Sequence, residues 1–352
     1  MSTTHVLQTP VEALTVAERG RIALAPAAAA PTRFGGTPFP DQGDLGPDEV
    51  FGPTICTLLS PGTEIANTFR PIVPEAGTPL PWIPGYASVF EVSQVGEQVQ
   101  TVRPGDLVYS LGGHRSHQRE RVSEVWRLPE GLDPFVGVFA RLMSIPMATL
   151  ATTAARPGAQ VGVSGLGPIG HLAAVAFHLS GYFVTAWDPR PERRALLPAG
   201  IEVRERAPEP TRRRQHGSIE GLDLVVECSG HDGAALSAVT AVRSGGEVVL
   251  VGTPWRRYTD ASAFDVMREV FFKYAVLRSG WEWQIPPATE PFRAVSSSQN
   301  ITRALAWLAE GRVATEALAQ RHRPADAQDV YESYTDGTAD RLTALFDWRP
   351  ER

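Results

Sequence analysis

The chain has 352 residues, of which 43% are hydrophobic, and it carries a formal net charge of -6 at pH 7. Because single hydrophobic cores stop growing near about 250–300 residues, this length predicts two domains, and the negative charge excludes a global basic field for nucleic acid or an anionic membrane. The two cysteines, Cys56 and Cys228, lie far apart in apolar contexts, which excludes a disulfide framework and a Cys-rich zinc module.

The N-terminal part of the chain predicts an all-β module. Apolar and polar residues alternate over 5–24 as in strands, the Ala-, Pro- and Gly-rich residues 25–47 predict a surface insertion, and Val50–Leu59 predicts a further strand. Short strands with Gly and Pro-Gly turns fill residues 82–128, and this frequency of turns favours a barrel-like module. Residues 134–153 then predict helix.

The central feature is the stretch 160–188. Residues 161–164 predict a short buried strand, a G-x-G-x-x-G motif follows, and an apolar helical pattern runs from there to Gly181. A second apolar strand ends in Asp188. This is the order of a dinucleotide-binding unit, in which the glycines allow a tight turn and close approach of the pyrophosphate, and the acid bonds both ribose hydroxyls. An acid there favours NAD over NADP. The alternative is a Gly-rich turn in another kind of α/β unit.

Three further buried strands are predicted after the motif, over Leu222–Glu227, Gly246–Val251 and Ala275–Arg278. Small residues follow each strand, and the carboxyl ends of parallel strands line the crevice in which a dinucleotide lies. The predicted cofactor-binding residues are Gly165, Leu166, Gly167, Pro168, Ile169, Gly170, Asp188, Arg193, Ser229, Gly252, Thr253, Ser279 and Gly280.

The remaining sequence predicts an amphipathic helix with Ile301, Leu305 and Leu308 on one face, and a final strand over 342–348. The N-terminus shows no basic and apolar leader, and no apolar run approaches membrane-spanning length. We therefore expect a cytoplasmic protein that acts on a small molecule and binds neither nucleic acid nor membrane.

The chain resembles the medium-chain dehydrogenase/reductase superfamily, which includes zinc alcohol, sorbitol and threonine dehydrogenases. The resemblance rests on the glycine motif with Asp188 and on the segments 85–92, 103–106, 223–230, 245–252 and 337–346. It implies an α/β fold class in which a GroES-like β-barrel domain (1–152 and 289–352) surrounds an inserted, doubly wound Rossmann domain (153–288). It also implies an active site between the domains and a homodimer.

The departures from the superfamily concern zinc. Members with catalytic zinc carry Cys before Gly-Ser/Thr-Asp and carry Gly-His-Glu, whereas this chain has Pro61-Gly62-Thr63-Glu64 and Gly85-Tyr86-Ala87. A four-Cys structural loop is absent too. Without thiolate and imidazole ligands a tetrahedral zinc has no ligand shell. The resemblance therefore implies a zinc-depleted branch, similar to bacteriochlorophyllide dehydrogenase and unassigned sugar-pathway relatives.

The resemblance also implies roles for individual side chains. Thr63 stands where zinc relatives carry a proton-relaying hydroxyl, and Tyr86 replaces a ligand histidine and can donate to a carbonyl oxygen. His117 titrates near neutrality and is the predicted general base. Tyr86 as simple packing is the alternative, and His114 with His117 as a metal pair lacks further ligands. Arg341 matches an arginine that reaches the cofactor pyrophosphate.

Together these residues predict a zinc-independent, NAD(H)-dependent oxidoreductase that interconverts a secondary alcohol and a ketone on a polyol, sugar, cyclitol or similar intermediate of specialised metabolism. Two alternatives stay open. One is an enone (C=C) reductase of the quinone-oxidoreductase type, which usually goes with NADPH and against which Asp188 argues. The other is a non-catalytic dinucleotide-binding protein.

Overall fold

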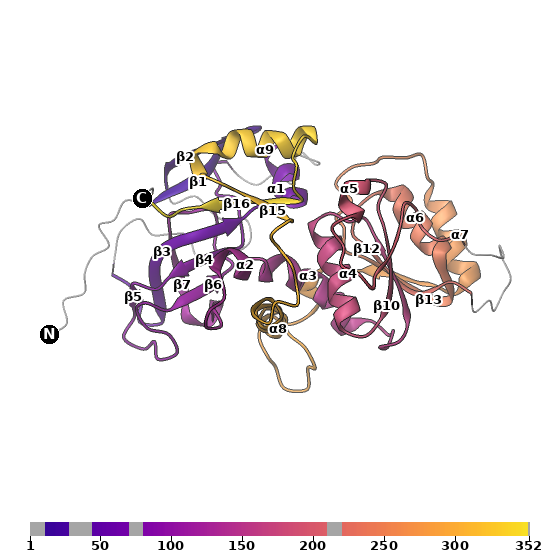
Figure 1. Ribbon diagram of the computed structural model, residues 1–352, viewed down its shortest axis with the longest axis horizontal. Helices are drawn as coiled ribbons and strands as arrows, with labels where there is room; N and C mark the ends of the chain where they lie inside the picture. Colours follow the sequence, from indigo (N-terminus) through magenta and orange to yellow (C-terminus); the bar gives the residue numbers. More distant parts are fainter. Residues whose placement is uncertain (1–10, 28–43, 70–79, 210–219, 351–352) are drawn as a thin grey trace. The chain divides into compact units, whose positions relative to one another are not determined.

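The structure, a computed structural model, describes residues 11–27, 44–69, 80–209 and 220–350 (Figure 1). Its contacts divide the chain into two compact units: unit 1 comprises Met1–Arg141 and Leu305–Arg352, and unit 2 comprises Leu142–Ala304. Unit 2 holds a parallel sheet, and unit 1 holds a separate, mostly antiparallel sheet. The predicted fold class is therefore confirmed. The expected insertion over 25–47 lies largely outside the described residues, and the domain boundaries after 152 and 288 stay predictions.

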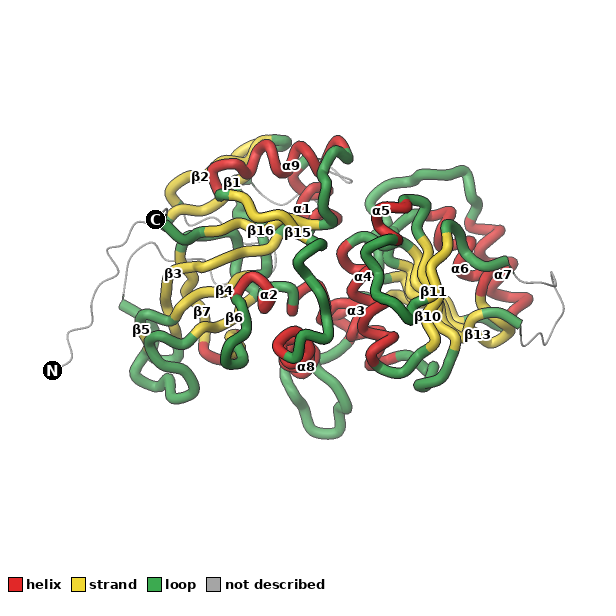
Figure 2. Tube along the Cα trace, viewed as in Figure 1, coloured by secondary structure: helices red, strands yellow, loops and turns green. Residues whose placement is uncertain are grey.

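Unit 2 is built on a six-stranded parallel sheet (Figure 2). Its strands are β9 (Gln160–Ser164), β10 (Phe183–Trp187), β11 (Glu202–Arg204), β12 (Leu222–Glu227), β13 (Val242–Leu250) and β14 (Val276–Ser279). They lie in the order β11-β10-β9-β12-β13-β14. The strand order thus reverses between β9 and β12, and a doubly wound sheet binds dinucleotides at the carboxyl edge of such a switch point.

Helices cover both faces of this sheet, which explains why its strands are nearly continuous apolar runs. The helices that contribute to unit 2 are α3 (Ala140–Thr152), α4 (Pro168–Leu179), α5 (Pro191–Arg194), α6 (Asp232–Ala241), α7 (Ala263–Lys273) and α8 (Ser297–Ala309), with a 3₁₀ turn η3 (Glu282–Gln284). Ala173 and Phe177 of α4 pack on one face, and Val239 of α6 packs on the other. The sequence analysis did not predict α7, which begins with a capping box between Ser262 and Asp265.

Unit 1 is organised around one long strand, β3 (Glu49–Leu58). Its first half pairs with β5 (Gln94–Val95) and β7 (His117–Arg121), and its second half pairs with β4 (Ser88–Glu91) and β16 (Thr343–Asp347). One strand therefore joins two sheets, as closure toward a barrel requires. The other strands are β1 (Glu12–Glu18), β2 (Arg21–Pro26), β6 (Leu107–Ser110), β8 (Val125–Arg127) and β15 (Ala319–His322).

Two helices of unit 1 share a core with the β1–β2 hairpin. Ile65 of α1 (Pro61–Thr68) and Tyr331 of α9 (Ala327–Asp336) pack with Leu14 and Phe346 in one buried cluster. The cluster joins segments from both ends of the chain, so the C-terminal segment completes the N-terminal core. The remaining elements of unit 1 are α2 (Pro134–Gly137), η2 (Val122–Glu124) and η4 (Pro324–Asp326).

The helical stretch Pro134–Thr152 is long and apolar enough to cross a membrane by length and composition. The expectation that no apolar run approaches that length was therefore wrong. Most of the stretch is buried inside the protein, as in the core helices of globular proteins, and Leu142 and Met143 are fully buried.

One carboxyl group lies buried on β7. Ser110 Oγ donates to Glu120 Oε1 at 3.3 Å. Burial, followed by the nearby charge of Glu124, raises the pKa of Glu120 from 4.5 to about 7. Because the unfolded chain keeps the lower value, the folded state binds more protons between these two pKa values. Folding stability from this group is full below pH 4.5 and is lost as the pH rises through 7.

We expect the substitution Glu120→Gln to remove this pH dependence. The wild-type protein should lose at most about 3 kcal/mol of unfolding free energy between about pH 5 and pH 8, because each pKa unit corresponds to about 1.4 kcal/mol. The variant carries a neutral side chain of similar shape at every pH, so it should not show this loss of unfolding free energy. Thermal unfolding of both proteins across this range measures the difference, and equal pH slopes would contradict the prediction.

Candidate active site

The glycine motif occupies the turn between β9 and α4 in unit 2. Gly165 has φ +81°, in the left-handed region that glycine tolerates, and a Cβ on Gly170 would lie 1.7 Å from the Gly165 carbonyl oxygen. Apart from the chain neighbours of Gly167, no atom of the described residues lies within 4 Å of the position that a Cβ on Gly167 would take. The three glycines therefore provide a tight turn, close packing and an open approach, which a pyrophosphate site needs.

The start of α4 presents backbone donors. Pro168 at the first helical position has no N–H, and the first hydrogen bond inside the helix runs from the His171 N–H to the Gly167 oxygen. The N–H groups of Ile169 and Gly170 therefore precede the helical ladder, at the end that carries partial positive charge. Leu166 has a buried side chain, so it offers only its backbone.

Asp188 follows β10 and is buried. Its Oδ2 accepts the N–H of Leu166 at 2.8 Å, and its Oδ1 accepts the N–H of Arg190 at 2.9 Å. Nη1 of Arg193 lies 3.4 Å from Oδ2. An ionised carboxylate offers about four lone-pair sites, so acceptor capacity for a ribose hydroxyl remains beside these three donors. The predicted acid is thus held against the predicted glycine turn.

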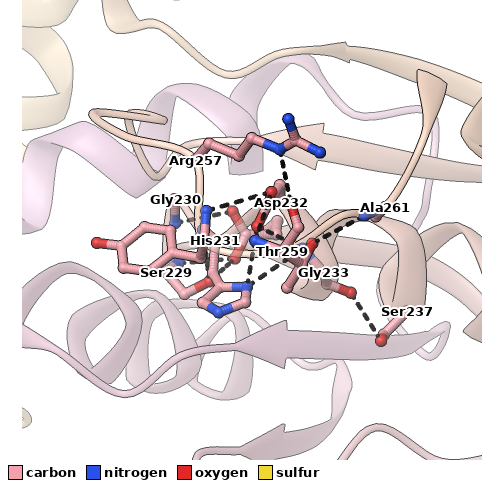
Figure 3. A network of polar contacts seen from close by, with 11 residues as sticks. Ser229, Gly230, His231, Asp232, Gly233, Ser237, Arg257, Thr259 and Ala261 are labelled. Atoms are coloured by element: carbon pink, nitrogen blue, oxygen red, sulfur yellow. Dashed lines mark hydrogen bonds and ion pairs between the residues drawn. The ribbon is translucent and has the colours of Figure 1, made fainter. Parts of the chain in front are cut away.

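The loops that follow β12 and β13 are tied to each other by polar contacts (Figure 3). Asp232 accepts the N–H groups of Tyr258 at 3.3 Å and Thr259 at 3.0 Å. The His231 ring stacks on the Tyr258 ring with centroids 4.6 Å apart, and Arg257 Nε donates to the Thr259 carbonyl at 2.7 Å. The contacts of Asp232 and His231 join the two loops at the carboxyl edge of the sheet, and the Arg257 contact lies within the second loop.

The same edge holds three predicted cofactor residues. Glu227 ends β12, and its buried carboxylate accepts the N–H groups of Ser229 at 2.8 Å and Gly230 at 3.0 Å. Burial raises the pKa of Glu227. A Cβ on Gly252 would lie 2.3 Å from the Gly230 nitrogen, so only glycine lets the two loops pass each other. Ser229, Gly252 and the exposed Thr253 are therefore brought together, as predicted from strand ends.

The last two predicted cofactor residues of unit 2 lie at the end of β14: Ser279 is its last residue, and Gly280 follows it. The Gly280 N–H donates to the Leu250 oxygen at 2.7 Å, and Ser279 Oγ accepts the Trp281 N–H at 3.1 Å. Arg341 belongs to unit 1, where it is exposed ahead of β16. Its contact with a cofactor pyrophosphate stays a prediction.

Two of the three predicted catalytic residues, Thr63 and Tyr86, lie together in unit 1. The Tyr86 hydroxyl donates to Ser60 Oγ and also bonds the Thr63 side chain. Burial raises the pKa of Tyr86, while the Arg141 guanidinium, 4.8 Å from the centre of its ring, opposes that rise. Tyr86 is therefore a protonated donor at neutral pH. Gly62 beside this hydroxyl cluster is exposed, and a Cβ there would meet open space.

A buried carboxylate, Glu64, adjoins the hydroxyl cluster. Its Oε1 accepts the Ser60 N–H at 2.7 Å. Its Oε2 accepts the Tyr331 hydroxyl at 2.5 Å and lies 3.0 Å from His114 Nε2. A Cβ on Gly85, which has φ +92°, would lie 2.8 Å from the His114 ring. The positive φ and the missing Cβ of Gly85 thus make room for a buried histidine beside this carboxylate.

His117, the predicted general base, has different neighbours. It begins β7, its ring stacks on Phe51 with centroids 5.4 Å apart, and its Nδ1 lies 3.1 Å from Ser116 Oγ. Burial lowers its pKa. No contact of His117 with Thr63 or Tyr86 is seen within the described part of unit 1, and its role as base stays a prediction.

Sequence reasoning assigned no role to Ser60, Glu64, Tyr331 or Arg141. The one local signal was the pair Ser60 and Glu64, a serine before a proline-started helix with an acid in its first turn. Tyr331 gave no signal, because it lies 267 positions from its partner Glu64.

The side chains around Tyr86 do not suit zinc. Pro61, Tyr86 and Ala87 supply neither a thiolate nor an imidazole, and both ring nitrogens of His114 are engaged by Thr57 and Glu64. Across the described ranges, no three His, Cys, Asp or Glu side chains are arranged to hold a metal ion. A zinc ion prefers four such ligands in tetrahedral geometry.

Comparisons with known proteins show which proteins this chain resembles. No family model matches the chain. The chain is 28% identical over 320 residues to 2-desacetyl-2-hydroxyethyl bacteriochlorophyllide A dehydrogenase from Rhodobacter capsulatus, covering 87% of this chain and 92% of the relative.

Solved structures show the same fold at low sequence identity. L-Idonate 5-dehydrogenase from Escherichia coli has a TM-score of 0.75 and 17% identity, covering 97% of this chain and 99% of that one. A protein from Sinorhizobium meliloti described as a zinc-binding dehydrogenase and solved with NADP has a TM-score of 0.73 and 17% identity, covering 97% of this chain and 100% of that one. With the glycine motif on a doubly wound sheet and the separate β-rich unit, these likenesses show that the chain belongs to the medium-chain dehydrogenase/reductase superfamily of NAD(P)-dependent oxidoreductases.

Proposed function

We propose that this chain is an NAD(H)-dependent oxidoreductase that interconverts a secondary alcohol and a ketone without zinc, on a polyol, sugar, cyclitol or similar hydroxylated intermediate. The observation that carries the proposal is the hydroxyl cluster of Ser60, Thr63 and Tyr86, in which the resemblance implies that Tyr86 replaces a ligand histidine and that Thr63 keeps a proton-relaying hydroxyl. The relative named for a hydroxyethyl compound and the neighbour named for L-idonate support a secondary alcohol as substrate. The nicotinamide, when bound, supplies or accepts the hydride.

Residues of unit 1 then bind the substrate oxygen and transfer the proton. When the substrate binds, the single hydroxyl proton of Tyr86 turns from Ser60 Oγ to the substrate oxygen, and Thr63 donates a second hydrogen bond. Such preorganised donors are most effective where negative charge develops. His117 is the proposed general base. Because burial lowers its pKa, its ring is neutral near pH 7 and able to accept a proton.

Exhaustive chelation tests the proposal directly. The purified chain should be screened with NAD⁺ against secondary alcohols and cyclic polyols, and with NADH against the matching ketones, while the absorbance of the reduced nicotinamide is followed. We expect turnover to survive chelation. Loss of turnover to the chelator with recovery on adding zinc would overturn zinc independence, and failure to bind either nicotinamide would favour a non-catalytic protein. Turnover of enones alone would favour the C=C reductase.

Cofactor choice is the next prediction. We expect NADH to bind more tightly than NADPH by about tenfold or more, because Asp188 repels a 2′-phosphate and bonds ribose hydroxyls. The contact of Arg193 with Asp188 at 3.4 Å opposes this preference, so Arg193→Ala should sharpen it while Asp188→Ser should abolish it. Fluorescence titration with both cofactors measures the effect. Tighter binding of NADPH by the wild type would contradict it.

The proposed assembly is a cytoplasmic homodimer formed through the β14 end of unit 2. Phe264, Met267 and Phe271 lie three and four residues apart on α7, so they share one helix face, and they are 61%, 61% and 74% exposed. α7 leads into β14, the edge strand of the described sheet, where Val276 is also exposed. A second copy related by two-fold symmetry would cover both features.

We expect sedimentation equilibrium to show a dimer that Phe271→Glu dissociates, because the substitution buries a charge in the interface. Phe183→Glu is the matched control, since Phe183 is 63% exposed but lies on β10, and it should leave the dimer intact. A monomeric wild-type protein, or a dimer that Phe271→Glu leaves unchanged, would contradict this interface.

A further inference from the structure

A directed chain of hydrogen bonds ends at Glu64. Trp348 Nε1 donates to Thr57 Oγ1 at 3.0 Å, and Thr57 Oγ1 lies 2.7 Å from His114 Nδ1. An indole N–H is only a donor, so Thr57 Oγ1 accepts from Trp348, which leaves it one lone pair and one proton to face His114 Nδ1. Because a carboxylate only accepts, His114 Nε2 carries the proton that faces Glu64. In the neutral imidazole, Nδ1 then accepts the hydroxyl proton of Thr57.

The Glu64 carboxylate is the acceptor at the end of this series of hydrogen bonds. It accepts hydrogen bonds from His114 Nε2, the Tyr331 hydroxyl and the Ser60 N–H. A buried carboxylate is tolerated when several donors compensate for the lost water, and three donors from three separate segments do so here. Its charge lies inside unit 1, one helical turn from the hydroxyl cluster.

Ser60 connects this carboxylate to the hydroxyl cluster. Its N–H donates to Glu64, and its Oγ accepts from the Tyr86 hydroxyl rather than capping α1. No acceptor for the Ser60 hydroxyl proton is found among the residues that the structure describes. Thr63, half-buried beside them, completes the cluster and adjoins the exposed Gly62. Fixing the backbone of Ser60 therefore fixes the oxygen toward which Tyr86 points.

We propose that Glu64 and His114 are positioning residues for the reaction, which hold Ser60 in place and keep Tyr86 a protonated hydrogen-bond donor. The inference rests on the proposed function. A zinc ion in this place would favour the ionised form of a neighbouring hydroxyl, whereas the negative charge of Glu64 favours the protonated form. The site thereby donates hydrogen bonds from neutral hydroxyls instead of binding the oxygen to a cation.

The charges around Tyr86 agree with this assignment. Burial raises its pKa, the Arg141 guanidinium lowers it, and Glu64 raises it again. Tyr331, the other tyrosine beside Glu64, has a pKa raised by burial and by the same carboxylate. Glu64 is thus the charged group near Tyr86 that opposes the effect of Arg141.

The direct test follows the titration of Tyr86 in the intact protein. Tyrosine isotopically labelled at Cζ gives one resonance for each of the seven tyrosines, and Tyr86→Phe identifies the one that belongs to Tyr86. We expect Glu64→Gln to let Tyr86 lose its proton at least about one pH unit lower than in the wild type, the size expected for removing a nearby like charge. The alkaline limb of the kcat/KM profile should move with it.

Two further variants separate positioning from simple folding. Glu120→Gln neutralises another buried carboxyl group of unit 1 and should leave the Tyr86 titration unchanged. Thr57→Val keeps Glu64 and a similar side-chain shape but removes the donor to His114 Nδ1. We expect it to lower kcat about tenfold with little change in KM, because His114 Nδ1 loses its hydrogen-bond partner and the ring is held less firmly against Glu64. If Glu64→Gln fails to fold, the kcat of Thr57→Val tests the positioning role instead.

The outcomes distinguish this inference from the proposed function. An unchanged Tyr86 titration in a folded Glu64→Gln variant, or wild-type kcat in Thr57→Val when Glu64→Gln does not fold, would overturn the positioning role even if the enzyme turns over alcohols. The expected titration shift in a protein that oxidises no alcohol would support the coupling and contradict the proposed function alone.

Discussion

Replacing Tyr86 by Phe is expected to lower kcat for alcohol–ketone interconversion by about 10²–10³-fold, the usual cost of removing one preorganised donor to a developing oxyanion. The hydroxyl is held in place beside Ser60, and burial raises its pKa, so it can contribute a hydrogen bond and no charge to the bound substrate. Because the substrate carbonyl gains negative charge only along the reaction path, the loss should fall on kcat more than on KM.

The control for this prediction is Tyr334→Phe. Tyr334 lies on the same helix as Tyr331, is partly buried in the same apolar cluster, and has a pKa raised by burial, but makes no contact with the described hydroxyl cluster. The Tyr334→Phe variant should have the same kcat as the wild type. Steady-state kinetics on the best substrate, with thermal unfolding to confirm the fold, measures both variants. A Tyr86→Phe enzyme with wild-type kcat would show that Tyr86 only fills the place of a lost ligand.

The second large effect is expected at Gly170. A Cβ there would lie 1.7 Å from the Gly165 carbonyl oxygen, which belongs to the backbone and cannot rotate away. Gly170→Ala should therefore separate α4 from the glycine turn, destabilise the protein by about 3 kcal/mol or more and abolish measurable NADH binding.

Gly167→Ala is the matched control, because it adds the same methyl group three residues earlier. Gly167 has φ -66°, an ordinary value for alanine, and a Cβ there would meet no atom within 4 Å among the described residues beyond its chain neighbours. We expect unfolding to change by less than about 0.5 kcal/mol, while NADH affinity falls at least tenfold because the methyl group occupies the approach of the pyrophosphate. Equal NADH affinity in the Gly167→Ala protein would place the pyrophosphate elsewhere.

Local signals were enough for the dinucleotide-binding unit. β9, the glycine turn and α4 follow one another within about twenty residues, and their conformations depend on short-range rules: an apolar run, a left-handed glycine, a helix that starts at proline. Local signals also predicted the ends of the later strands. The small residues that we expected to face a cofactor lie at the carboxyl ends of parallel strands. α7 escaped prediction because its outward face is apolar at Phe264 and Met267, which blurs the helical pattern.

By itself, then, the sequence determined the doubly wound sheet, the glycine turn and the acid that faces it. Only the tertiary structure decided which groups surround Tyr86. His114 rather than His117 adjoins Glu64, and Tyr331 and Trp348 reach their partners across 267 and 291 positions of chain. Such contacts depend on which faces of distant elements pack together, and no spacing within a short stretch of sequence encodes that choice.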